Sequence, residues 1–185
     1  FAGTAGPDLI KGLRNDARHV SVWSGISPNL ADDLLRRRLD IIVTTDPLDN
    51  RAGLDRRPLM REPFVLVVPR RMADAGAPAR LEDLARHLPF VRYSQRSLIG
   101  AQIESYLDGL GADIAQTLEF DGTDSVFAMV DAGLGWAITT PLCLIHGAGR
   151  DSGLVPFPLP GPPLSRDLYV LCREGEMAAL SERVR

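Results

Sequence analysis

Arg96 is the residue whose type and neighbours point most directly to chemistry. It lies in Ser94–Ser97, with the sequence SQRS, at a predicted turn from a strand into a helix. A guanidinium among two hydroxyls and the amide of Gln95 can bind a carboxylate through two parallel hydrogen bonds. The alternative is an arginine on the rim of the fold that pairs with a surface acid. The segment therefore predicts either a carboxylate site or a structural ion pair.

A second candidate for anion binding is the start of the segment 122–141, GTDSVFAMVDAGLGWAITTP. Thr123 and Asp124 suit the cap of a helix, because a side-chain oxygen there accepts hydrogen bonds from free backbone N–H groups. Gly133 suits the left-handed residue that ends such a helix. A helix N-terminus beside a strand end with hydroxyls favours a small anion. Asp124 is predicted either to cap the helix or to contact the ligand, and an ordinary capped helix followed by a strand is the plainer interpretation.

The remaining reactive residue types form no motif that indicates catalysis or metal binding. His19, His87 and His146 lie outside local metal and nucleophile patterns. Cys143 and His146 would share one helix face, but no third group is placed to orient a thiol–imidazole pair. Cys172 lies in an apolar strand and is predicted to belong to the core. We therefore expect a protein that is not an enzyme, with no catalytic residue, no metal and no cofactor.

Helices and strands alternate along the chain in two halves of similar rhythm, which predicts an α/β fold. The first part favours a parallel sheet, with a short strand at 20–23 and a buried strand at 40–45. The segment 153–163 holds a proline-rich strand, which favours a sheet edge, and 177–185 is predicted to close the chain as a helix. Ligands of open α/β sheets bind beyond the carboxyl ends of the strands. Those ends are rich in Thr, Ser, Gly and Asp, so they predict a hydrogen-bonding cleft rather than a reaction centre.

The composition is that of a globular protein and argues against several classes of function. Of the 185 residues, 45% are hydrophobic and 24% are charged, which is enough for a substantial core. The formal net charge of −3 does not mark the chain as a nucleic-acid binder. Two cysteines without metal-ligand spacing fit a cytoplasmic protein, and no apolar run is long enough to span a bilayer. The chain begins at Phe1 without an initiator Met, so we expect a fragment of a longer protein.

Several segments, in order over nearly the whole chain, resemble motifs of the effector-binding domain of LysR-type transcriptional regulators. SGISPNLADDLLRRRLDIIVTT is similar to the family's turn, leucine-rich helix and L-D-aliphatic-aliphatic strand, and PDLIKGLR is similar to its first helix. FVLVVPRR resembles its crossing strand, LEDLARHLPFVRYS its L-x-D-L helix and next strand, and MVDAGLGWAITTP its V-A-A-G-x-G-I-x-x-x-P signature. The WAITTP segment is one residue longer than is usual in the family, and the H-P-L that usually follows the crossing strand is absent.

The resemblance implies an α/β fold of two Rossmann-like subdomains in a periplasmic-binding-protein-like (type 2) arrangement with a central cleft. Regulatory subdomain I would comprise 1–67 plus 171–185, and regulatory subdomain II would comprise 68–170. The family's N-terminal DNA-binding domain, a winged helix-turn-helix, precedes this region and is absent from this chain. A solute-binding protein of a transport system has the same architecture and is the alternative.

The function that the resemblance implies is ligand sensing that controls DNA binding and transcription. The effector would be a small metabolite, an organic acid or an amino-acid-like compound, bound in the cleft between the subdomains. Partners would be this effector, a homodimer or homotetramer through the regulatory domain, and DNA only through the missing N-terminal domain, with no membrane. The family's effector-binding positions correspond to these residues: Thr4, Ile26, Ser27, Thr45, Ser94, Gln95, Arg96, Ser97, Thr123 and Asp124.

Overall fold

A computed structural model of the protein describes residues 6–13, 19–23, 27–74, 76, 78–147 and 152–176. The helix predicted at 177–185 lies outside the described residues. Among the residues that the structure does describe, no helix is both long and apolar enough to cross a membrane.

The chain divides into two compact units. Unit 1 comprises Phe1–Arg61 with Arg166–Arg185, and unit 2 comprises Glu62–Ser165. The predicted boundaries between the subdomains, after residues 67 and 170, lie a few residues later than these. Its assignment of regulatory subdomains stays a prediction.

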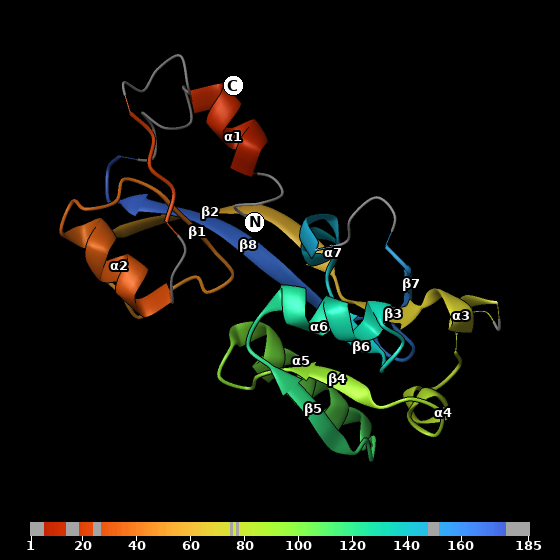
Figure 1. Cartoon of the computed structure of the whole chain (residues 1–185). Helices are drawn as coiled ribbons and strands as arrows, with labels where there is room; N and C mark the ends of the chain where they lie inside the picture. Colours follow the sequence, from red (N-terminus) through yellow and green to blue (C-terminus); the bar gives the residue numbers. More distant parts are fainter. Residues whose placement is uncertain are drawn as a thin grey trace. The chain divides into compact units, whose positions relative to one another are not determined.

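Unit 2 alternates strands and helices over most of its length (Figure 1). Its elements in chain order are β3 (Val65–Pro69), α3 (Arg70–Ala73), α4 (Leu81–Ala85), β4 (Phe90–Tyr93), α5 (Leu98–Leu110), β5 (Gln116–Phe120), α6 (Thr123–Asp131), β6 (Ala137–Thr139), α7 (Pro141–Gly147) and β7 (Leu154–Pro158). This alternation confirms the α/β character that the sequence predicts.

The strands of unit 2 are joined by both parallel and antiparallel pairing. β3 pairs antiparallel with β6 on one side and with β7 on the other, and β4 pairs parallel with β5. A parallel bridge between Phe90 and Trp136 joins β4 to the start of β6, and the Val91 N–H donates to the Trp136 carbonyl at 2.8 Å. β4, β5 and β6 therefore run in the same direction. β7 lies at an edge, as its prolines predict.

The core of unit 2 packs around β4, whose four residues are all buried. Both α5 and α6 pack against this strand (Figure 1). Phe90 stacks on Trp136 with ring centroids 4.6 Å apart, and such a pair adds about 1 kcal/mol to the burial of the two rings. On the side of α5, Arg92 and Glu104 form a buried ion pair with Nη1 and Oε2 3.1 Å apart. Packing on both faces thus fixes β4, and with it the position of the loops at its two ends.

The described part of unit 1 contains a small sheet and two helices. Its elements are α1 (Gly6–Leu13), α2 (Ser27–Leu35), β1 (Ile42–Thr44), and most of β2 (Leu54–Pro63) and β8 (Ser165–Arg173), the two strands in which the chain passes between the units. The sheet order is β1-β8-β2, and β1 pairs antiparallel with β8. Among the described residues, β1 does not have the parallel neighbour predicted for the first part of the chain. The strand that pairs with it, β8, comes from the distant C-terminal part and runs in the opposite direction.

The core of unit 1 joins α2 to this sheet. Its buried residues are Ala31, Leu34, Ile42, Leu48, Leu54 and Leu171. The strand predicted at 20–23 is wrong, since this segment has no regular structure and Val22 and Trp23 are 56% and 72% exposed. A strand needs a neighbour for its backbone N–H and C=O groups. Among the described residues, no ladder includes this segment.

Candidate functional site

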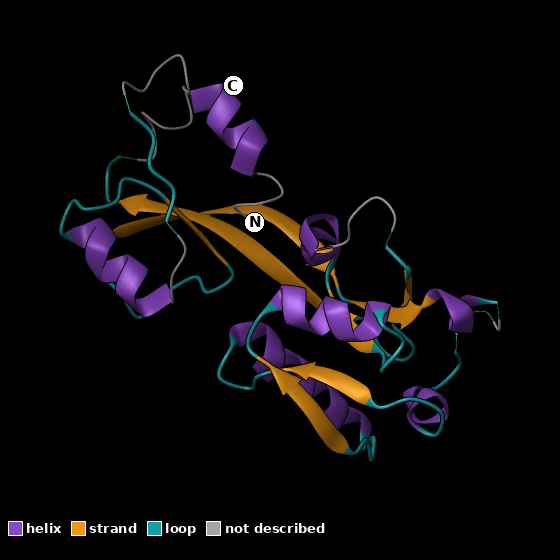
Figure 2. Ribbon diagram, in the orientation of Figure 1, coloured by secondary structure: helices purple, strands orange, loops and turns teal. Residues whose placement is uncertain are grey.

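The carboxyl ends of β4, β5 and β6 meet at one edge of unit 2, because the three strands run in the same direction. Each strand leads into a helix, so α5, α6 and α7 all begin at this edge (Figure 2). The first N–H groups of a helix have no acceptor within the helix, and the aligned peptide dipoles make this end positive. We call residues 94–97, 121–124 and 139–141 the carboxyl edge. Its backbone geometry favours a small anion.

The turn from β4 into α5 is fixed by short local hydrogen bonds. The Ser94 N–H donates to the Phe120 carbonyl at 2.9 Å, which ties the turn to the end of β5. The Ser97 hydroxyl donates to the Ser94 carbonyl at 2.6 Å and accepts from the Gly100 N–H at 3.1 Å, so Ser97 caps α5. A Cβ on Gly100 would lie 2.1 Å from the Ser94 carbonyl oxygen. Glycine is therefore required at position 100 for the helix to begin this close to the strand.

Arg96 reaches from the end of β4 to the end of β5. Its Nη2 lies 3.3 Å from Asp121 Oδ1 and 3.4 Å from Oδ2, and its Nε lies 3.4 Å from Ser94 Oγ. The ion pair that the sequence analysis gave as one interpretation is thus present. The Arg96 and Asp121 side chains are 84% and 76% exposed, so the pair contributes at most about 1 kcal/mol. The guanidinium therefore remains accessible to a carboxylate from solution, and Gln95 is exposed beside it.

Thr123 and Asp124 lie in the first turn of α6 and do not cap it. The cap residue is Gly122, with φ −112° and ψ 140°, so the cap itself provides no side-chain acceptor. The predicted cap is therefore wrong by one position, because the backbone becomes extended at Gly122 and Thr123 is already helical. Asp124 is exposed, and its charge lies at the positive end of the helix. The prediction for the other end is confirmed, since Gly133 has φ 76° just after the helix.

Two threonines at the carboxyl edge, Thr139 and Thr140, were not among the predicted site residues. Both are fully buried, and Thr139 Oγ1 lies 2.9 Å from the Tyr93 hydroxyl, which links the end of β6 to the end of β4. The hydroxyl pair before Pro141 was the signal available in the sequence.

Glu62 is a buried carboxylate that the sequence reasoning missed. It is 2% exposed, and its Oε2 accepts from the Leu142 N–H at 3.1 Å in the first turn of α7. A carboxylate of the protein itself therefore occupies the start of this helix. No local motif could have indicated this role, because Glu62 and Leu142 are far apart in the sequence.

In unit 1, Thr45 directly follows β1 and is partly buried. The next residues are held by backbone-to-side-chain bonds: the Asp46 N–H donates to Thr44 Oγ1 at 3.1 Å, and the Leu48 N–H donates to Asp46 Oδ1 at 2.9 Å. The Arg56 guanidinium donates to four carbonyls of the same loop, those of Pro47, Leu48, Arg51 and Leu54. Hydrogen bonds thus fix the loop that follows Thr45.

For the other predicted effector-binding residues of unit 1, no side-chain position is described. Thr4 and Ile26 lie outside the described residues. Ser27 is the first residue of α2, and only its backbone is described. The structure therefore brings together the predicted residues of unit 2, at 94–97 and 123–124.

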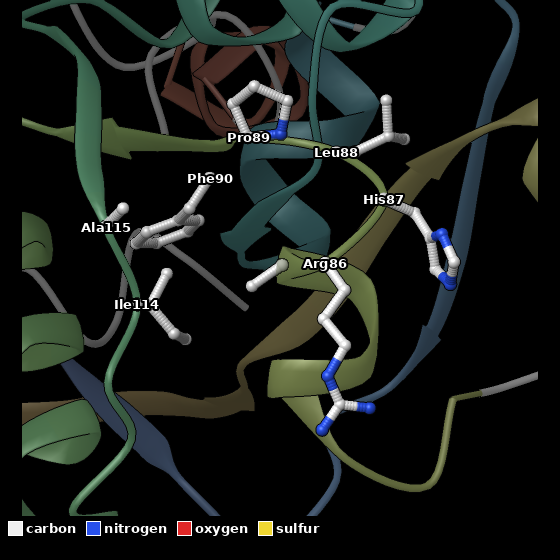
Figure 3. A pocket seen from close by; sticks show the side chains of 8 residues that line it. Arg86, His87, Leu88, Pro89, Phe90, Ile114 and Ala115 are labelled. Carbon is white, nitrogen blue, oxygen red and sulfur yellow. The ribbon is translucent and has the colours of Figure 1, made fainter.

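A depression of about 240 Å³ lies at the opposite end of β4 and β5 (Figure 3). Its lining residues are Ala85, Arg86, His87, Leu88, Pro89, Phe90, Ile114 and Ala115. In Figure 3 the Arg86 and His87 side chains point away from Phe90 and Ile114, and Arg86 Nη1 donates to Asp83 Oδ1 at 2.9 Å. None of the predicted site residues lines this depression.

The part of the chain that the structure describes contains no group of three or more His, Cys, Asp and Glu side chains that could hold a metal ion. Burial raises the pKa of the Cys172 thiol, and the nearby carboxylates of Asp55 and Glu176 raise it further. A thiol with a raised pKa is a weak nucleophile at neutral pH. Cys172 is fully buried on β8, as the sequence predicts for a core residue.

Three solved structures with the same fold are regulatory or effector-binding domains. The reduced form of the regulatory domain of OxyR2 from Vibrio vulnificus is 20% identical, with a TM-score of 0.80, and the match covers 100% of this chain and 88% of that chain. The CcmR regulatory domain from Synechocystis PCC6803, in complex with 2-PG, is 16% identical, with a TM-score of 0.76 and coverage of 98% and 92%. The effector binding domain of QuiR, in complex with shikimate, is 15% identical, with a TM-score of 0.74 and coverage of 97% and 88%.

The family model described as LysR substrate binding domain matches residues 1–185, which is the whole chain. A comparison with curated proteins gave no match. The match to the family model favours the regulator over the transport protein that the sequence analysis kept as an alternative. It also confirms the resemblance and the fold class that the order of the motifs predicts. The chain therefore belongs to the LysR substrate binding domain family.

Proposed function

We propose that the chain is the ligand-sensing domain of a LysR-type transcription factor and that it recognises a small organic acid or amino-acid-like metabolite. The carboxyl edge carries this proposal. There α5 and α6, of 13 and 9 residues, begin beside the exposed guanidinium of Arg96. Two positive helix ends and one arginine suit a small ligand with a carboxylate. The solved CcmR and QuiR domains, which share the fold, hold the small ligands 2-PG and shikimate.

The proposal gives each group at the carboxyl edge a role in binding. Arg96 pairs with the anionic group of the effector, while Ser94 and Gln95 offer hydrogen bonds around it. Ser97, whose hydroxyl caps α5, holds the start of this helix beside the ligand. The first-turn N–H groups of α6, at Thr123 and Asp124, complete the contacts of unit 2. Further contacts are assigned to these residues of unit 1: Thr4, Ile26, Ser27 and Thr45. The cleft between the two subdomains stays a prediction.

The effector regulates transcription only if it binds two states of the protein unequally, because a ligand shifts an equilibrium by its difference in affinity. In the proposed full-length regulator, an N-terminal DNA-binding domain binds the operator. The regulatory domain forms a homodimer or homotetramer. Effector binding then changes the arrangement of the DNA-binding domains. The protein acts in the cytoplasm and does not turn over its ligand.

Calorimetry of the 185-residue chain against a panel of organic acids and amino acids tests the proposal. Replacing Arg96 with Ala removes a charge-assisted hydrogen bond, which contributes about 1.5 to 3 kcal/mol. We therefore expect Arg96→Ala to weaken binding by about ten- to a hundredfold. Arg86→Ala is the matched control, because Arg86 is also an exposed arginine of unit 2 with a carboxylate partner but lies at the other end of β4. It should bind the effector like the parent chain.

A transcription assay with the full-length protein provides the functional readout. Arg96→Ala and Thr45→Val should each reduce the response to the effector without abolishing DNA binding. No binding across the panel, together with an unchanged response in both variants, would show that the proposal is wrong.

A further inference from the structure

The guanidinium assigned to the effector is already paired with a carboxylate of the protein. Both oxygens of Asp121 face Arg96 Nη2, at 3.3 and 3.4 Å. Asp121 directly follows β5, and Arg96 lies in the turn after the parallel strand β4, so the sheet itself places the two side chains together. The Arg96 backbone N–H and Nε also face the hydroxyl of Ser94, which is 2% exposed. The carboxylate of Asp121 thus occupies the position that a ligand carboxylate would take.

Other groups at the carboxyl edge are held in ways that do not allow such an exchange. Ser97 is engaged by the cap of α5, and the start of α7 is occupied by Glu62, which is buried. Asp121 differs from Glu62 because its side chain is 76% exposed. Water and ligands therefore reach the Arg96–Asp121 pair directly, and an exposed pair of this kind is weak enough to be exchanged.

We propose that Asp121 is an internal competitor for the effector, whose carboxylate displaces it from Arg96 on binding. The inference rests on the proposed function, which assigns Arg96 to the effector. It defines the ligand class more narrowly, because only a group that pairs with a guanidinium at least as well as a carboxylate can take this position. A neutral or purely cationic compound has no anionic group that could replace Asp121 at Arg96, so it gains nothing by the exchange. Asp121 is then a residue that determines specificity.

The size of the effect follows from the exposure of the pair. An exposed ion pair contributes at most about 1 kcal/mol. Removing the Arg96–Asp121 pair from the ligand-free protein should therefore raise the affinity for the effector by about 1.5- to fivefold. Asp121→Asn keeps the shape of the side chain and removes its charge, so Arg96 no longer has a charged competitor. The variant should bind carboxylates more tightly by this factor. Because Asp121 is exposed, the substitution leaves the fold intact.

Nuclear magnetic resonance of the 185-residue chain can follow the exchange at Arg96 itself. The Nε–H signal of Arg96 is recorded while succinate, which carries two carboxylates, is added at constant ionic strength. In the parent chain succinate should shift this signal, and in Asp121→Asn half-saturation should occur at a concentration about 1.5- to fivefold lower. Asp108→Asn is the matched control, since Asp108 is an exposed carboxylate near the other end of α5. It should titrate like the parent chain.

A double-substitution cycle separates direct competition from a general effect of charge. In an Arg96→Gln background, where backbone amide signals at the carboxyl edge report binding, Asp121→Asn should give no gain. Equal half-saturation in the parent chain and Asp121→Asn, or an equal gain in Asp108→Asn, overturns the competitor role alone. If succinate and a panel of organic acids move no signal at the carboxyl edge in any variant, the competitor role and the proposed site both fall.

Discussion

The two ends of the parallel pair β4–β5 are built from opposite kinds of residue. At the carboxyl edge, serines, threonines, the exposed Arg96–Asp121 pair and the starts of helices come together. At the amino end, the depression is lined mainly by apolar side chains, and beside it Trp136 Nε1 donates to the Leu88 carbonyl at 3.1 Å. This depression therefore lacks polar groups that converge on its floor.

A depression of this kind is not by itself a binding site. A ligand pocket needs a few polar groups that converge on the ligand, and at the amino end the arginine and histidine point away from the apolar floor (Figure 3). At the carboxyl edge the direction of the strands places polar groups together by geometry. Substitutions at the two ends should therefore have different consequences, with mainly structural effects at the amino end and both structural and binding effects at the carboxyl edge.

Gly100→Ala should have the largest effect on stability. The added Cβ would lie 2.1 Å from the Ser94 carbonyl oxygen, so α5 must shift away from the end of β4. Overpacking of this kind costs about 3 kcal/mol of the free energy of unfolding. Urea denaturation followed by circular dichroism measures it. Gly109→Ala, in the same helix, is the matched control because nothing lies within 4 Å of a Cβ there, and it should stabilise the protein by about 0.5 to 1 kcal/mol.

Trp136→Phe should destabilise the packing at the amino end of β4. The substitution leaves the Leu88 carbonyl without its donor and shortens the ring that stacks on Phe90. The expected loss is about 2 kcal/mol of the free energy of unfolding. Trp23→Phe is the control, since Trp23 is 72% exposed, and its effect should stay within about 0.5 kcal/mol. A similar loss for both tryptophans in thermal denaturation would contradict the packing described for this end.

Ser97→Ala tests the cap at the carboxyl edge. It removes the side-chain acceptor of the Gly100 N–H and should cost about 1 kcal/mol in urea denaturation. Ser125→Ala is a suitable comparison, because Ser125 is exposed in the first turn of α6, where no side chain caps the helix. It should change the free energy of unfolding by less than about 0.5 kcal/mol. Equal losses in the two variants would mean that Ser97 does not act as a cap.

Asp121→Asn should have the smallest effect on stability. The pair with Arg96 is exposed on both sides, so its loss should cost less than about 1 kcal/mol, and the cost should shrink as salt is added. Denaturation at low and high salt measures both quantities. A loss of several kcal/mol would show that the pair is part of the fold rather than an exchangeable contact.

Turns and helix ends that depend on residues close together in the chain could be predicted from the sequence. The turn from β4 into α5 was predicted at SQRS, and Gly133 ends α6 as expected. The cap of α6 was misplaced by one residue, because Gly122, Thr123 and Asp124 are all suitable types and only the backbone angles decide among them.

The sequence could not predict what depends on distant partners. The antiparallel pairing of β1 with β8 joins residues near the two ends of the chain, and the apolar segment 20–23 has strand-like residues but no described ladder partner. The pairing of Arg96 with Asp121 requires β4 and β5 to be parallel neighbours in a known register. Glu62 reaches α7 in the same non-local way.

A crystal structure of the 185-residue chain with the tightest-binding compound from the panel tests the central claim most directly. Our account predicts density for the anionic group of the compound at the carboxyl edge, within hydrogen-bonding distance of Arg96, with Asp121 turned away. Density in the depression beside Phe90 and Ile114, with Arg96 still paired to Asp121, would contradict it.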